Sequence, residues 1–316
     1  MEIGKDVAKD SRVEGTVELS QAAVEAFHLG MPRGSISGQA VGDFSVDLVA
    51  NEPPRWSLVS DLEGAGLRIP SLGWSISEKT PGSLSLTASL GETAVVDQLD
   101  LTAPGLSVTG SITTSAGGGL EQARFDKVQV GNWMTGSAEL VGRGDAAPAV
   151  NVLSGVLDMR KAPFSGASGA AGNGGDSAPI SLRLDRLQGT DSIALHNFTG
   201  KFSTLGGFNG NFSGALNGQA AISGQVVPQN SGVATRIRSE DAGSVFRSAG
   251  VLRHGRGGSF DMTLIPADKP GEYDGRIKVQ NTRVKEAPTM AALINSLSLI
   301  GLFDELAGQG ILFTRV

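Results

Sequence analysis

Apolar and polar residues alternate strictly over long parts of this sequence, and few folds are compatible with that pattern. Residues 83–90 alternate leucine or alanine with serine or threonine, and residues 106–113 repeat the pattern directly after Pro104-Gly105. Successive side chains of a strand point to opposite faces of a sheet, so this period predicts strands with one apolar and one polar face. The Pro-Gly turn makes residues 106–113 one arm of a predicted hairpin.

The longest alternating tract runs from Phe198 to Val226. Most of its even positions carry phenylalanine, glycine or an aliphatic residue, whereas many odd positions are polar. The tract far exceeds an average strand of about 5 to 6 residues, so we predict turns at Gly206-Gly207 and Asn217-Gly218. Clean alternation is typical of antiparallel strands with one solvated face. The sequence therefore predicts a mainly β protein built on a long antiparallel sheet.

Three short helices are predicted beside the strands. Residues 18–29 carry apolar residues at helical spacing, with Ser20 as a candidate N-cap. A second helix is expected to begin after Ser239, where the charges of Glu240 and Asp241 suit the positive end of a helix dipole, and to stop at Gly250. Residues 287–307 form the third and most amphipathic segment.

Residues 165–179 consist mainly of glycine, alanine and serine, which predicts a flexible loop or linker. We therefore expect a first β part over residues 1–164 and a second over residues 180–316. A long loop inside one continuous sheet is an equally good interpretation.

Residues that carry chemistry are scarce. Only three histidines occur, namely His28, His196 and His254, and none has a neighbour at metal-ligand spacing. Cysteine is absent, and the sequence contains neither a nucleophile elbow nor a phosphate-binding loop. The net charge of −6 argues against nucleic acid as a partner. We expect no catalytic residues, no metal site and no cofactor.

Basic residues cluster around the second predicted helix. Arginine forks suit phosphate head groups, but a solvated face paired with Glu240, Asp241 and Asp261 is the favoured interpretation. The cluster comprises Arg236, Arg238, Arg247, Arg253, His254 and Arg256.

An apolar sheet face of this length needs a cover, because exposed apolar surface costs about 25 cal/mol per Å². Either a second sheet closes over it, or it stays open as a groove for a ligand with acyl chains. Several apolar-side positions between Phe198 and Val226 are glycine, such as Gly210 and Gly224. Small residues leave space where a packed core would place leucine or valine, which favours the groove.

Four segments resemble, in their order, the C-terminal region of the AsmA superfamily of bacterial envelope proteins, close to YhdP and TamB. They are Leu67–Trp74, Gly155–Arg160, Ser239–Phe246 and Ala287–Val316. The resemblance extends over residues 55–316, and each motif is degenerate when taken alone.

This resemblance implies a long curved sheet with an apolar inner groove and no catalytic residues. Members of the family are anchored in the inner membrane, lie in the periplasm and are implicated in moving phospholipid towards the outer membrane. Since no anchor follows Met1 and a strand-like run stops at Val316, we expect a fragment of a longer protein.

The resulting hypothesis is non-enzymatic phospholipid binding and transfer between the two membranes, in support of outer-membrane homeostasis. The alternative is a scaffold for outer-membrane proteins that acts through sheet edges, and other envelope proteins are candidate partners. The candidate lipid-binding residues are Phe198, Phe202, Phe208, Phe212, Leu216 and Ile222.

Overall fold

Extended strands dominate the protein. The computed structural model describes residues 11–26, 34–116, 118–163, 178–230, 232–267 and 272–284. Within these residues the chain forms 21 strands, two α-helices and one short 3-10 helix. The predicted mainly β architecture is confirmed.

The chain divides into two compact units, unit 1 over residues 1–148 and unit 2 over residues 149–316. Most of the predicted linker, from residue 165 to residue 177, lies outside the described residues. Its role as a loop or linker stays a prediction.

Unit 1 contains the helix α1 (Gln21–Ala26) and two groups of strands. Its long strands are β1 (Ser11–Leu19), β3 (Ala40–Leu48), β4 (Arg55–Ser60), β7 (Ser83–Leu90), β8 (Ala94–Ala103), β9 (Leu106–Thr114), β10 (Leu120–Val130) and β11 (Met134–Arg143). A small sheet of β2 (Ile36–Gly38), β5 (Ala65–Ile69) and β6 (Trp74–Ile76), with the 3-10 helix Pro70–Leu72, completes the unit.

Unit 2 contains the helix α2 (Ala242–Ser248) and a second set of strands. These are most of β12 (Ala146–Asp158), whose first three residues belong to unit 1, and β13 (Pro179–Gln188), β14 (Ala194–Ser203), β15 (Asn209–Leu216), β16 (Ala220–Gln229), β17 (Gly232–Ser239), β19 (Ser259–Pro266) and β20 (Tyr273–Gln280). The strands β18 (Gly255–Arg256) and β21 (Arg283–Val284) pair as a separate sheet of two.

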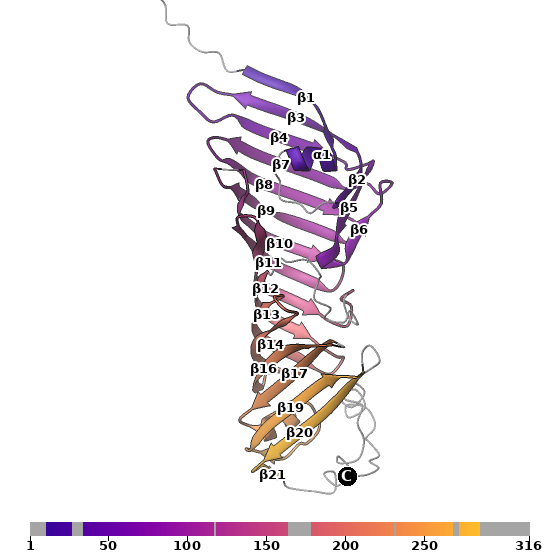
Figure 1. Cartoon of the computed structure of the whole chain (residues 1–316), viewed down its shortest axis with the longest axis vertical. Coiled ribbons are helices and arrows are strands. Elements are labelled where there is room, and N and C mark those ends of the chain that lie inside the picture. The colour runs from indigo at the N-terminus through magenta and orange to yellow at the C-terminus, as the bar shows by residue number, and fades with distance from the viewer. Residues whose placement is uncertain are drawn as a thin grey trace, which may run out of the picture. The chain divides into compact units, whose positions relative to one another are not determined.

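The sixteen long strands form an open sheet with a simple order (Figure 1). That order is β1-β3-β4-β7-β8-β9-β10-β11-β12-β13-β14-β15-β16-β17-β19-β20, with β1 and β20 at its two ends. The pairing is mostly antiparallel, as predicted. β12 and β13 differ, because they pair in parallel with Val150 opposite Ile180.

The predicted turns are confirmed. Pro104-Gly105 joins β8 to β9, and Gly105 has a φ of 77°, which glycine adopts without strain. Gly206-Gly207 lies between β14 and β15, and Asn217-Gly218 lies between β15 and β16. The long alternating tract is therefore divided into three strands at the positions where the sequence predicts turns.

Two of the three predicted helices lie in the described residues. Ser20 Oγ accepts a 3.4 Å hydrogen bond from the Ala23 amide at the start of α1. Asp241 caps α2 by accepting a 2.9 Å bond from the Ser244 amide, and α2 ends before Gly250. The third predicted helix, residues 287–307, lies outside the described residues.

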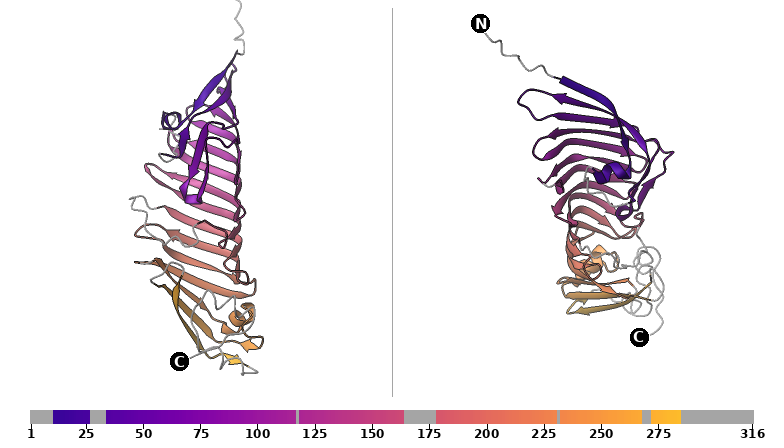
Figure 2. Two further views of the ribbon diagram at one scale, coloured as in Figure 1. Left: turned by 90° about the vertical axis from the view of Figure 1, so that its right-hand side faces the viewer. Right: turned by 45° about the horizontal axis from the view of Figure 1, so that its top comes forward.

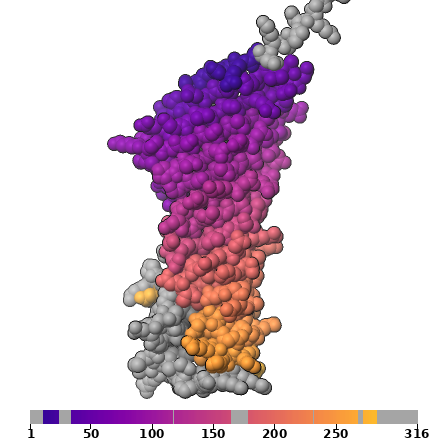
Figure 3. Space-filling view, turned by 180° about the vertical axis from the view of Figure 1, so that it is seen from behind, coloured from indigo at the N-terminus to yellow at the C-terminus, as the bar shows by residue number. Residues whose placement is uncertain are grey.

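In unit 1 the small sheet and α1 lie over one face of the long strands (Figures 1 and 2). Figure 3 shows these strands from behind, coloured from indigo to magenta. The two faces of unit 1 thus differ in what covers them, and this difference determines where a ligand could bind.

Candidate functional site

The six residues predicted to bind lipid lie on one face of unit 2. Phe198 and Phe202 lie in β14, Phe212 and Leu216 in β15, Ile222 in β16, and Phe208 directly before β15. The register aligns them, with Phe202 opposite Gly210 and Phe212 opposite Gly224.

The four phenylalanines form two stacked pairs. The ring centroids of Phe198 and Phe212 are 5.7 Å apart, and those of Phe202 and Phe208 are 5.0 Å apart. Phe198 and Phe202 are buried. These rings therefore contact one another across the strands, and they take up the space over this face.

The glycines of this face do not leave empty space. A Cβ atom on Gly224 would lie 2.1 Å from Cζ of Phe212, and one on Gly200 would lie 2.3 Å from Cε2 of Phe202. Each ring covers the bare backbone of a glycine, an arrangement known to stabilise sheets. Glycine at these positions does not make room for acyl chains, contrary to the prediction, because the space is filled by the protein's own aromatic rings.

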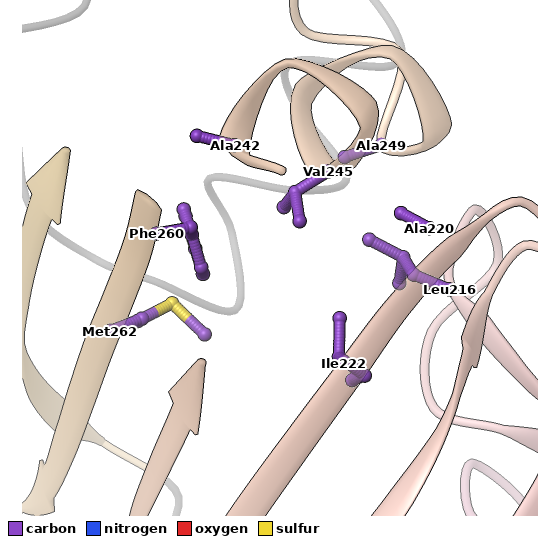
Figure 4. Close-up of a cluster of buried hydrophobic side chains, with 8 residues drawn as sticks. All are labelled: Leu216, Ala220, Ile222, Ala242, Val245, Ala249, Phe260 and Met262. Carbon is purple, nitrogen blue, oxygen red and sulfur yellow. The ribbon is translucent and has the colours of Figure 1, made fainter. Parts of the chain in front are cut away.

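Leu216 and Ile222 lie in the core beneath α2 (Figure 4). They are 7% and 6% exposed and belong to one buried cluster with Val245 of α2 and with Phe260 and Met262 of β19. The helix closes this part of the face. Both side chains therefore pack against α2 as part of the protein's own core.

Unit 1 carries a second apolar face, which the sequence analysis did not single out as a site. Residues paired across its eight long strands form two rows without any polar side chain, here called the apolar rows. One row consists of Val13, Val46, Trp56, Ala88, Val96, Ile112, Ala123 and Leu140, and the next of Gly15, Phe44, Leu58, Leu86, Leu99, Gly110, Phe125 and Ala138.

A β-bulge in β8 keeps these rows continuous. The register shifts between Val96, which belongs to the first row, and Leu99, which belongs to the second. A bulge inserts one extra residue, so two apolar residues three positions apart come to the same face. Without this shift, half of β8 would present polar side chains to the apolar rows.

One end of this face is covered. The small sheet and α1 lie over it, and Ala40, Leu106 and Val130 at this end are almost completely buried. Trp74 of β6 donates a 2.9 Å hydrogen bond from Nε1 to the carbonyl of Pro104. That bond ties the small sheet to the β8–β9 turn.

The other end of the face is open. Val13, Leu48 and Leu90 lie there on the apolar side and are 50%, 41% and 39% exposed. Between the two ends, Phe44 and Trp56 are partly exposed. The apolar face thus extends from a covered core to solvent, with the row of Phe44 nearer the covered end and the row of Trp56 nearer the open end. This surface can bind apolar chains through burial alone.

An ion-pair cluster shifts the pKa of Asp158 and holds two connections of unit 2 together. Asp158 accepts a 2.8 Å hydrogen bond from Arg160 Nε, and the Arg160 guanidinium also pairs with Asp191. The side-chain bond from Arg160 lowers the pKa of Asp158 from 3.8 to about 2. The cluster links the end of β12 to the β13–β14 connection.

The predicted basic cluster is partly paired. Arg236 donates a 2.8 Å bond to Asp261, and Arg238 lies 3.5 Å from the same carboxylate. The hydrogen bond from Arg236 is the main cause of a lowered pKa at Asp261. The predicted pairing with Asp261 is confirmed, while Asp241 serves as the cap of α2.

The described part of the chain contains no group of three or more His, Asp or Glu side chains placed to hold a metal ion. None of its helices has the length and apolar character needed to cross a membrane.

Comparison with protein-family models, with curated proteins and with solved structures finds no match. The resemblance to the AsmA superfamily therefore stays a prediction, and the functional argument depends on the geometry of the two units.

The sequence did contain a signal for the apolar rows. Alternation in residues 83–90 and 106–113 predicts strands with an apolar side, and those strands supply Leu86 and Ile112. Exposure of the rows depends on the small sheet covering one end only. No local pattern indicates how far such a cover extends.

Proposed function

We propose that this protein binds phospholipid acyl chains on the apolar rows of unit 1 and transfers them without chemistry. The observation that carries the proposal is an unbroken apolar surface across eight strands that remains exposed at Val13, Leu48 and Leu90. The lipid would enter at this open end. Its head group would stay in water.

Energetics support such binding. Each buried CH₂ group of an acyl chain contributes roughly 0.8 kcal/mol, so a chain lying along part of the rows gains several kcal/mol. Non-directional burial tolerates different chain lengths. A passive carrier needs this tolerance, and it needs no catalytic group.

The setting of the proposal comes from the family resemblance. We propose that the protein lies in the periplasm, attached to the inner membrane through an upstream anchor, with phospholipid moving between the inner and outer membranes. Maintenance of the outer membrane is the corresponding biological role.

Matched variants of the two faces of unit 1 test the proposal. V13D/L48D/L90D places carboxylates at the open end of the apolar face, whereas V41D/V59D places them on the polar face of the same sheet, where Val41 and Val59 are 61% and 56% exposed. The measurement is native mass spectrometry of the full chain after incubation with phospholipid vesicles. We expect bound lipid in the wild type and in V41D/V59D, and none in the triple variant. Equal lipid retention by a folded triple variant would exclude this face.

A scaffold function is the second candidate. β1 and β20 are the ends of the strand order within the described residues, and an edge strand offers backbone N–H and C=O groups to an added strand. Capture of a client peptide with backbone pairing to β1, together with no lipid retention, would favour the scaffold.

A further inference from the structure

The polar face of the unit 2 sheet carries an ordered set of cations. Cross-strand pairing places Lys201, Arg236 and Arg276 in one row over the strands from β13 to β20. Arg183, Arg238 and Lys278 lie in the adjacent row. All six are exposed, and the two rows are here called the cationic rows.

These rows contain a single carboxylate, that of Asp261, which pairs with Arg236 and Arg238. Every other member is Ser, Thr, Asn or Gln. The two rows therefore combine an excess of positive charge with neutral hydrogen-bond donors. Phosphate oxygens accept hydrogen bonds from both kinds of group.

The charge excess is specific to unit 2. Unit 1 has 19 acidic and 10 basic residues, a net charge of −9, whereas unit 2 has 13 acidic and 16 basic residues, a net charge of +3. The overall charge of −6 conceals this contrast. Of the two units, only unit 2 has a net charge that favours contact with an anionic surface.

A cleft of about 790 Å³ overlaps one end of the face, but its charges do not suit a free anion. Arg238 and Lys278 line it together with Glu240, Asp241 and Asp261, so carboxylates outnumber cations there. The positive charge is spread over seven strands and is not concentrated in the cleft. An extended array of phosphates fits this distribution better than one small ligand does.

We propose that the cationic rows dock unit 2 onto the head groups of an anionic phospholipid bilayer. The choice of a membrane as the partner rests on the proposed lipid function. The charge pattern itself is observed independently of that function. Arginine forks and lysine ammonium groups would contact lipid phosphates. Each cation close to such a surface strengthens binding roughly fivefold.

Co-sedimentation of the full chain with vesicles tests the docking surface. Vesicles of equal parts phosphatidylcholine and phosphatidylglycerol should bind the wild type, and vesicles of phosphatidylcholine alone should not. The variant K201Q/R276Q/K278Q should weaken binding on the order of 100-fold, since three charges are lost. Added NaCl should release the wild type because it screens exposed charges.

The control variant R68Q/K79Q/K127Q removes three exposed cations from unit 1 and changes the net charge equally. We expect it to bind vesicles as the wild type does. R183Q/K201Q is a second test of the cationic rows, in case the triple variant does not fold. Equal weakening by the control, or unchanged binding of both test variants, would overturn the proposal.

Two further readouts separate the alternatives. A salt-sensitive dimer in analytical ultracentrifugation without vesicle binding would assign the cationic rows to the acidic unit 1 of a second copy and overturn membrane docking. Uptake of a monomeric short-chain phospholipid needs no bilayer, so its failure alongside intact vesicle binding would refute the lipid-carrier function and leave docking standing.

Discussion

The phenyl ring of Phe212 covers Gly224 on the neighbouring strand of unit 2, where a Cβ atom would lie 2.1 Å from the ring's Cζ. Phe212 and Gly224 are direct cross-strand partners. A phenylalanine on one strand therefore faces a glycine on the next, and the aromatic ring occupies the space above the glycine backbone.

Gly224→Ala is expected to destabilise the protein by about 1 to 3 kcal/mol, because the added methyl group displaces the Phe212 ring. Urea unfolding followed by circular dichroism measures the change. Gly189→Ala is the control, since its nearest neighbour would lie at an ordinary 3.6 Å. A G224A variant as stable as G189A would show that the ring moves aside at no cost.

Asp158→Asn is expected to cost on the order of 1 to 3 kcal/mol at neutral pH, because charge-assisted bonds from Arg160 are lost. The folded pKa of Asp158 is about 2 and its ordinary value is 3.8, so this stabilisation is complete above the ordinary value. It disappears as the pH falls through about 2.

The difference in the free energy of unfolding between wild type and D158N should therefore be constant near neutral pH. It should fall towards zero as the pH decreases from 3.8 to about 2. Unfolding midpoints over that range measure it. D126N is the control, because Asp126 has an exposed ion pair with Arg124. A gap that stays constant down to the lowest pH would contradict this assignment.

Asp241→Ala should lower stability by about 1 kcal/mol, since the first turn of α2 loses its N-cap. Asp241→Asn keeps an accepting oxygen and should retain most of that stability. Thermal unfolding of the two variants gives the comparison. Equal losses in both would indicate that the carboxylate charge, and not the cap bond, is required.

Trp56 should report lipid binding, because its partly exposed ring belongs to the apolar rows. We expect its fluorescence to shift to shorter wavelength and to be quenched by brominated phospholipid. Trp74 and Trp133 are buried, so their emission should stay constant. The response should vanish in W56F, and a response that persists there would place the lipid elsewhere.

Some of the candidate site could be predicted and some could not. Alternation placed Phe198, Phe202 and Phe212 on one face correctly, because side-chain direction in a strand is local. It did not reveal that Leu216 and Ile222 lie beneath α2, since that contact joins segments distant in the sequence.

The β-bulge in β8 also could not be predicted from the sequence alone. In β8 the apolar positions change from even to odd between Val96 and Leu99, which interrupts a simple period of two. The bulge restores a single face only because β7 and β9 hold the backbone on either side.

The sequence by itself determined that the chain forms strands, where several of them turn and which side of each is apolar. These properties follow from backbone geometry over a few residues. Tertiary structure alone decided which apolar faces are closed and which are open. Closure depends on how far α2 and the small sheet of unit 1 reach over the strands, and that reach is set by packing between segments far apart in the chain.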